Sequence, residues 1–345
     1  MNDINSNRRR FLQRSSAAAG AALLGSAWPA SVLAADHKTM TLYSGQHSNT
    51  TNALVKAFTR ATRINVEVRK GHSAQLANQI IEEGERSPAD VFYSEESPPV
   101  VVLAEKGRLA KLPADTLKQI PSRYVGRDGT WVGVSARCRV VVYNTTMIRK
   151  DELPKSVLDF ATPAWQGKVA YVPTSGAFQE QIIAIELLKG RTAALDWLKG
   201  LKAYGEPYNG NMAAMRAVEA GEIATALIND YYWFSVAAEV GAAKMKSALY
   251  YIGHKDPGAL ITVSAAGVLK SARHPSAAQQ LLAFMVSAAG QTAIADSVAE
   301  YPLRPGIRSP FALKPFNEID PPDVTPADLG DAADALALRR AAGLA

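Results

Sequence analysis

The sequence predicts an α/β fold with two domains, each built on a mostly parallel sheet with flanking helices. Short apolar runs typical of buried strands alternate with segments whose apolar residues recur at helical spacing. This alternation occurs in two successive series, and a chain of 345 residues has the length of about two domains. Alternating strands and helices favour parallel sheets, because each helix returns the chain to the same edge.

The first series of predicted elements ends near residue 143. Its predicted strands are 40–43, 64–68, 89–93, 131–134 and 140–143. Apolar residues at helical spacing predict helices near 54–61, 76–81 and 100–109, the last of which should end at Gly107.

The second series repeats the pattern and then returns to the first domain. Its predicted strands are 169–172, 224–228 and 248–252, and its predicted helices are 178–188, 195–198 and 212–220. A strand at 260–269 and a helix at 277–286 then lead back. We expect a last helix over 326–342, capped by Thr325, to pack on the second domain.

The N-terminal segment resembles a twin-arginine export signal. Arg8 and Arg9 are followed by Phe11 and Leu12, an Ala/Leu/Gly-rich run and a small-residue site near Ala34. The alternative is a membrane anchor, but glycine, serine and proline interrupt the run well short of about 20 apolar residues. We therefore expect residues 1–35 to be cleaved and the protein to reach the periplasm without stable membrane insertion.

Charge and cysteine content restrict the function. The formal net charge of +6 falls to +3 when the predicted signal takes four arginines and one aspartate with it. No Lys/Arg cluster with interleaved aromatic residues indicates nucleic acid binding. Cys138 is the one cysteine, so the chain forms no internal disulfide; its place beside the segment 139–143, with its apolar run, indicates a buried inert thiol rather than a nucleophile or metal ligand.

Polar residues follow four of the predicted strands. Ligands of open parallel sheets bind beyond the carboxyl ends of the strands, so these positions are the candidate site. Two come from each domain, which predicts a ligand in a cleft between the domains. The segments are 45–47, 94–96, 174–177 and 229–232.

The most specific of these segments contains Tyr231 and Tyr232 after an apolar strand. Neighbouring side chains diverge on a strand or a helix, so two adjacent phenols can meet only where regular structure breaks. One interpretation is a pair of anionic oxygen ligands for a highly charged metal ion. The alternative is an aromatic core pair or a stacking surface for an organic ligand.

His47 and Glu95 extend the metal hypothesis. Taken singly, His47 is equally a hydrogen-bonding histidine and Glu95 a carboxylate at a helix start. With the two tyrosines they form a mostly hard, oxygen-rich set that suits a trivalent cation such as Fe³⁺. Two tyrosinates and one carboxylate balance three positive charges, and a metal ion can deprotonate such ligands.

An anion is a candidate for the two remaining positions of an octahedral ion. Ser175, Gly176 and Ala177 lie at a predicted helix start, where unpaired backbone N–H groups favour negative charge. The alternative is a simple capping turn made by Ser175. Asn211 and Asn229 are further candidate donors, or ordinary cap and turn residues.

These residues resemble the periplasmic ferric-ion-binding proteins, transferrin-like members of the class II periplasmic binding proteins. The resemblance covers about residues 42–310 and rests on the segments 43–47, 88–95, 139–143, 156–163, 174–178, 226–229, 231–233, 254–260 and 300–304. It implies two lobes joined by two crossover strands near 139–143 and 260–264. The implied lobes are 36–138 with 262–312, and 139–261 with 313–345.

The resemblance also implies site roles and partners. The implied iron ligands are His47, Glu95, Tyr231 and Tyr232; the implied anion contacts are Ser175, Gly176, Ala177, Asn211 and Asn229. Members that hold phosphate commonly have glutamine where this chain has Glu96, so the anion here is open between phosphate, carbonate, citrate and water. A monomer that closes on iron and delivers it to an inner-membrane ABC permease and its ATPase is expected.

Two other classes of function are alternatives to iron capture. An enzyme is disfavoured because no nucleophile-elbow, HExxH, Walker A or dinucleotide-binding motif occurs. A binding protein for a small organic or oxyanion solute is the stronger alternative, in which the tyrosines stack or donate hydrogen bonds and no metal is held.

Overall fold

Two sheets that share long strands form the framework of the computed structural model, which describes residues 39–345. The predicted export signal lies outside the described residues. In the described part of the chain, no helix has both the length and the apolar character needed to cross a membrane.

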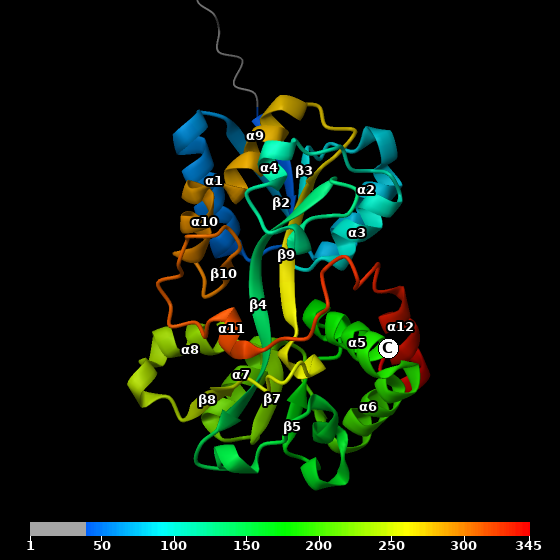
Figure 1. Cartoon of the computed structure of the whole chain (residues 1–345), viewed down its shortest axis with the longest axis vertical. Helices are drawn as coiled ribbons and strands as arrows, with labels where there is room; N and C mark the ends of the chain where they lie inside the picture. Colours follow the sequence, from blue (N-terminus) through cyan, green and yellow to red (C-terminus); the bar gives the residue numbers. More distant parts are fainter. Residues whose placement is uncertain (1–38) are drawn as a thin grey trace, which may run out of the picture. The chain divides into compact units, whose positions relative to one another are not determined.

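The first sheet begins with three parallel strands, β1 (Thr39–Ser44), β2 (Asn65–Lys70) and β3 (Val91–Ser94). Strand β9 (Ile261–Val268) joins β3 in antiparallel fashion. The helices of this lobe are α1 (Ser48–Thr62), α2 (Ser73–Glu83), α3 (Pro98–Glu105), α4 (Ala114–Leu117), α9 (Pro275–Val286) and α10 (Ala288–Ala295). We call this the N-terminal lobe; it fills the upper part of Figure 1.

The second sheet contains β5 (Val169–Tyr171), which runs parallel to β6 (Glu206–Pro207) and to β7 (Thr225–Asn229). Strand β8 (Ser247–Tyr250) belongs to the same sheet and pairs in antiparallel fashion with the strand that covers residues 141–144. The helices of this C-terminal lobe are α5 (Gly176–Lys189), α6 (Arg191–Tyr204), α7 (Asn211–Ala220), α8 (Tyr231–Val240) and α12 (Ala333–Ala342). Helix α12 packs on α5 and α6, as Figure 1 shows.

Strand β4 (Trp131–Asn144) belongs to both sheets. Its first half pairs with β9, and its second half, from Arg139, pairs with β7 and β8. The sequence predicted two separate strands here, but one continuous strand runs through, and every one of its residues is buried. Figure 1 shows β4 and β9 side by side between the lobes. The predicted two-lobed α/β fold with two crossover strands is confirmed.

The other predicted strands and helices are present, with ends that differ by a few residues. The exception is the final helix. It begins at Ala333 rather than Pro326, because Thr325 donates to the Asp328 carboxylate instead of capping a helix, and Ala332 has a positive φ of 64°. Five elements were not predicted: the helices α4, α10 and α11 (Phe316–Ile319) and the short strands β6 and β10 (Tyr301–Pro302).

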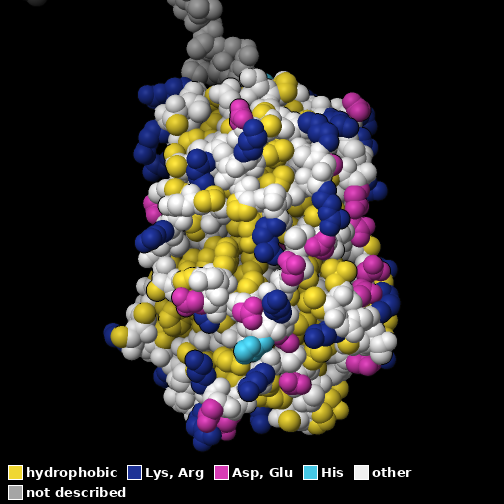
Figure 2. Space-filling view, in the orientation of Figure 1, with side chains coloured by type: hydrophobic (Ala, Val, Ile, Leu, Met, Phe, Trp, Pro, Cys, Tyr) yellow, Lys and Arg dark blue, Asp and Glu magenta, His cyan; other side chains and the backbone are white. Residues whose placement is uncertain are grey.

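One apolar core runs through both lobes, from Phe58 of α1 and Leu281 of α9 along β4 to Met215 of α7. A second core lies within the C-terminal lobe and joins Phe178 of α5 to Trp197 of α6, whose ring centroids stack 5.2 Å apart. Cys138 is buried as predicted. On the face shown in Figure 2, positive and negative side chains are interspersed.

Candidate metal centre

The tyrosine pair lies where regular structure breaks. Strand β7 ends at Asn229, and helix α8 begins at Tyr231 after the single residue Asp230. The two phenol rings lie with their centroids 4.1 Å apart and tilted by 35°. The expectation that adjacent phenols meet at a strand-to-helix junction agrees with this geometry.

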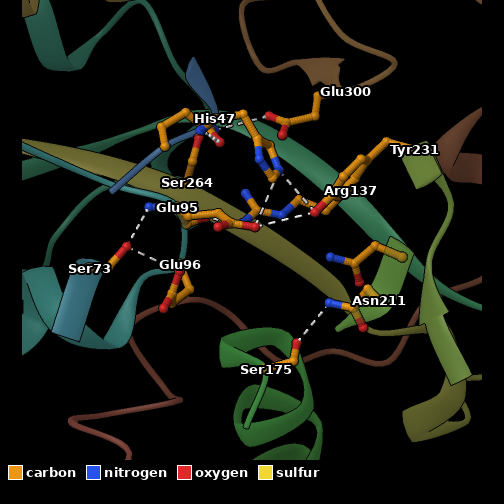
Figure 3. Close-up of polar contacts among 12 residues, drawn as sticks. His47, Ser73, Glu95, Glu96, Arg137, Ser175, Asn211, Tyr231, Ser264 and Glu300 are labelled. Carbon is orange, nitrogen blue, oxygen red and sulfur yellow. Dashed lines mark hydrogen bonds and ion pairs between the residues drawn. The ribbon is translucent and has the colours of Figure 1, made fainter. Parts of the chain in front are cut away.

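Side chains from the opposite lobe reach the same point. The Nε2 atom of His47, the residue before α1, lies 3.0 Å from the Tyr231 hydroxyl oxygen. That hydroxyl donates to Oε1 of Glu95, which follows β3, at 3.2 Å, and His47 Nε2 lies 3.4 Å from the same carboxylate oxygen. Figure 3 shows the three side chains converging. The two lobes are therefore in contact through this candidate site.

Tyr232 is the next residue of α8, and its side chain contacts α7 of the C-terminal lobe. Its hydroxyl oxygen accepts a hydrogen bond from Nδ2 of Asn211 at 3.2 Å. The His47 ring lies edge-on to it, with centroids 6.5 Å apart. The structure thus places all four sequence-predicted ligand side chains in one cluster, with three donor atoms within hydrogen-bonding range of one another.

The electrostatics of the cluster disfavour free phenolates. Burial, reinforced by the neighbouring Tyr232 and Glu95, raises the pKa of Tyr231 well above its usual value. Burial and the nearby Glu95 raise the pKa of Tyr232 to about 12. Both phenols therefore hold their protons at neutral pH unless a cation supplies compensating charge.

Arg137 was not found by sequence reasoning, yet it lies under the cluster. This side chain of β4 is 1% exposed, and its Nη2 lies 3.7 Å from Oε1 of Glu95 and also bonds the Glu95 carbonyl oxygen. Two arginines inside a strand of mostly apolar residues are the signal that could have revealed it. Its buried positive charge therefore lies beside the carboxylate of a candidate metal ligand.

The residues predicted to contact an anion lie at the start of α5 and on the neighbouring strand β7 and helix α7. Ser175 immediately precedes α5 and makes no side-chain cap, and its Oγ accepts from Asn211 Nδ2 at 3.2 Å. Ala177 is buried in the first turn. Asn229 is placed differently: its side-chain oxygen accepts from Nη1 of Arg139 at 3.2 Å, so its carbonyl faces the buried arginine.

Glu96 lies against the start of α5. A Cβ added at Gly176 would overlap the Glu96 carboxylate, which accepts from Ser73 Oγ at 3.3 Å. Burial, together with Glu95 and Glu180, raises the pKa of Glu96 to about 8. A carboxyl group of the N-terminal lobe therefore lies at the seat where an exogenous anion is expected.

A cavity of about 820 Å³ opens beside this cluster and is lined, among others, by Glu95, Glu96, Ser175, Gly176, Asn211 and Tyr232. Within residues 39–345, no group of three or more His, Cys, Asp or Glu side chains is arranged to hold a metal. The candidate centre instead combines one imidazole and one carboxylate with two phenols.

The fold and the cleft define a solute-binding protein, and the chain belongs to the bacterial extracellular solute-binding protein family, whose model matches residues 53–315. It is 46% identical over 307 residues to the major ferric iron-binding protein of Neisseria meningitidis, covering 88% of this chain and 93% of that relative. It is 38% identical over 289 residues to the Fe(3+)-binding periplasmic protein of Serratia marcescens, covering 84% and 86%.

Comparison with solved structures gives the same family of relatives. Iron-bound HitA from Pseudomonas aeruginosa superposes with a TM-score of 0.87 at 53% sequence identity, covering 89% of this chain and all of that one. The family resemblance seen in the sequence is confirmed by these relatives. The family consists of solute-binding proteins, in keeping with the absence of enzyme motifs from the sequence.

Proposed function

We propose that this protein captures ferric iron in the cleft between its lobes, with His47, Glu95, Tyr231 and Tyr232 as ligands. The observation that carries this proposal is the convergence of His47, Glu95 and Tyr231 from opposite lobes, with donor atoms 3.0–3.4 Å apart. The iron-binding names of its relatives support the same cargo.

Charge balance favours a trivalent ion over a divalent one. Two tyrosinates and the Glu95 carboxylate offset three positive charges, while His47 binds as a neutral imidazole. Hard phenolate and carboxylate oxygens prefer a hard cation. Without the ion both phenols keep their protons at neutral pH and Tyr231 donates a hydrogen bond to Glu95, so iron must displace these protons in order to bind.

The ion's remaining positions go to an anion or to water. The N–H groups at the start of α5, with Asn211 and Asn229, form the proposed seat. Glu96 occupies space beside Gly176, and its negative form would repel phosphate. We therefore propose that Glu96 decides which anion this protein accepts.

Export and transport complete the proposal. Residues 1–35 would direct twin-arginine export and be removed, leaving a periplasmic monomer. The lobes would comprise 36–138 with 262–312 and 139–261 with 313–345; β4 changes its pairing partners at Arg139, which supports a hinge there. The loaded protein would then pass iron to an inner-membrane ABC permease driven by its ATPase.

The colour of the ferric protein tests the proposal. Ferric salt added to the purified protein should produce a visible tyrosinate-to-iron charge-transfer band, which Tyr231→Phe and Tyr232→Phe should each weaken. Tyr204→Phe, at the end of α6 and away from the site, is the matched control. A colourless mixture would instead support the second candidate, an organic or oxyanion solute bound in the same cavity without metal ligation.

A further inference from the structure

The segment 300–304 belongs to the family resemblance, yet the proposed iron ligands leave it without a role. It begins with Glu300, which lies just before β10 in the N-terminal lobe. The side chain of Glu300 is 0% exposed. Burying a carboxyl group costs free energy unless polar partners surround it, so its contacts indicate what it does.

Glu300 is linked to His47 through one intervening side chain. Oε2 of Glu300 accepts a hydrogen bond from Nε2 of Gln46 at 3.4 Å, and Oε1 of Gln46 accepts from the backbone N–H of His47 at 2.8 Å. Figure 3 shows Glu300 on the same side of the cluster as His47. The link ends at the residue that carries the imidazole ligand.

The orientation of the Gln46 amide depends on its acceptors. The side chain is buried between the end of β1 and the start of α1. Its N–H₂ group donates to Glu300 and also to the Tyr93 hydroxyl oxygen at 3.5 Å. Two acceptors on this side turn the amide oxygen toward the backbone of His47, which is the group it must meet to hold the loop.

The carboxyl group of Glu300 is held in turn by the crossover strands. Ser135 of β4 donates its hydroxyl to Oε2 of Glu300, and the Ser135 Oγ lies 2.7 Å from Oγ of Ser264 on β9. Both serines are buried, and they face each other where β4 pairs with β9. Glu300 therefore joins the His47 loop to the paired strands that run between the lobes.

Arg137 interacts by charge with Glu300 and with the second candidate ligand of this lobe. Burial alone would lower the pKa of Arg137, but the charges of Glu300 and Glu95 raise it. Nη2 of Arg137 bonds the Glu95 carbonyl oxygen and lies 3.7 Å from its carboxylate. Glu300 thus supports the surroundings of both ligands that the N-terminal lobe supplies.

We propose that Glu300 is a positioning residue for iron capture: it orients Gln46 and, through Gln46, holds His47 where its imidazole meets the ion. This inference rests on the proposed ferric function and adds a residue that the ion does not touch. A ligand that is held in place before binding loses less conformational freedom when the ion arrives, so the affinity is higher.

The ferric affinity of the full chain, measured from the charge-transfer band in competition with a chelator, tests the proposal. Glu300→Asp shortens the side chain by one methylene and should break its contact with Gln46. Gln46→Met removes the amide and breaks the link at its other end. Each should weaken ferric affinity about tenfold to a hundredfold, the usual cost of losing a partner behind a metal ligand. The band at saturating iron should persist, because both tyrosines remain.

A double-mutant cycle separates positioning from a general structural effect. If Glu300 acts through His47, Glu300→Asp should change the ferric affinity of a His47→Ala protein by no more than about twofold. An effect of the same size with and without His47 overturns the inference. Wild-type affinity in both Glu300→Asp and Gln46→Met overturns it as well.

Glu105→Asp is the matched control, since it makes the same substitution at an exposed position at the end of α3, and it should leave ferric affinity unchanged. Thermal unfolding checks that each variant is folded. If Glu300→Asp does not fold, the cycle of Gln46→Met with His47→Ala decides by the same criterion. A wild type without the band overturns the ferric function and this inference with it, whereas a normal wild-type band with unaffected variants overturns this inference alone.

Discussion

At the level of single residues, the protons on the tyrosines determine how the site responds to pH. The pKa of Tyr231 lies well above its usual value and that of Tyr232 is raised to about 12, mainly by burial. A ferric ion must displace both protons to gain two phenolate ligands. Binding should therefore be linked to the release of protons.

We predict that ferric affinity falls as pH decreases from 8 to 5. Two displaced protons correspond to a loss of about a hundredfold per pH unit, because each proton contributes a factor of ten. The measurement is the charge-transfer band in competition with a chelator whose own protonation is accounted for. Tyr232→Phe should halve the slope, and a pH-independent affinity would contradict tyrosinate ligation.

Glu96 gives a second prediction at this scale. Glu96→Gln removes a carboxylate beside Gly176, so iron binding in phosphate buffer should become about tenfold tighter. Because the pKa of Glu96 is raised to about 8, its charged form develops as pH rises through 8, and the advantage of the variant should grow over that range. Glu82→Gln, exposed on α2, is the control; identical phosphate dependence in wild type and Glu96→Gln would refute the role of Glu96.

At the level of elements, strand β4 carries two buried arginines, Arg137 and Arg139, where it passes from one sheet to the other. Arg137 bonds to Glu95 of the N-terminal lobe, and Arg139 bonds to Gln181 and Asn229 of the C-terminal lobe. Residues two apart on a strand point to the same face. One strand thus bonds, through these two arginines, to polar residues beside the candidate site in both lobes.

Helix α6 offers a test of packing. Ala is a better helix former than Gly by about 1 kcal/mol, so Gly200→Ala would ordinarily stabilise α6. Here a Cβ would overlap the backbone carbonyl of Ala161, which cannot rotate away. We expect a net loss of about 1–3 kcal/mol in the free energy of unfolding, measured by urea denaturation.

The control for that substitution is Lys199→Ala, one residue earlier and exposed on the same helix. It should change the unfolding free energy by no more than about 0.5 kcal/mol. If Gly200→Ala is as stable as wild type or more stable, the result would contradict the close contact between α6 and the backbone of Ala161.

For the described molecule as a whole, a buried contact between the lobes matters as much as the metal cluster. Glu180 of α5 accepts hydrogen bonds from the backbone N–H of Ser97 at 3.3 Å and from its hydroxyl at 3.1 Å, at the start of α3. Its other carboxylate oxygen has no hydrogen-bond partner within residues 39–345. Burial raises the pKa of Glu180 to about 7.

The Glu180→Gln variant should reveal this contact as a pH-dependent difference in stability. A carboxyl whose folded pKa is raised stabilises the fold below its unfolded pKa, and that contribution is lost as pH rises through about 7. Relative to Glu180→Gln, wild type should therefore lose about 2–3 kcal/mol between pH 4.5 and 8. Thermal or urea unfolding at several pH values measures the difference, and parallel curves for the two proteins would disprove it.

The sequence by itself determined the order of strands and helices, the two lobes and the four candidate ligands. Strand ends in a parallel sheet converge in space, so the polar residues that follow them could be placed together without coordinates. Tyr231 and Tyr232 were informative because adjacent phenols meet only at a break in regular structure.

Tertiary structure alone decided which distant groups surround those residues. Arg137 and Glu180 come from elements whose contacts depend on how the lobes pack, and no local pattern encodes that packing. Thr325 shows why local patterns are not sufficient. Its position predicted a helix cap, but its hydroxyl donates a hydrogen bond to Asp328, and the helix begins only at Ala333. Local propensity sets the elements, whereas long-range burial and charge pairing decide what the elements do together.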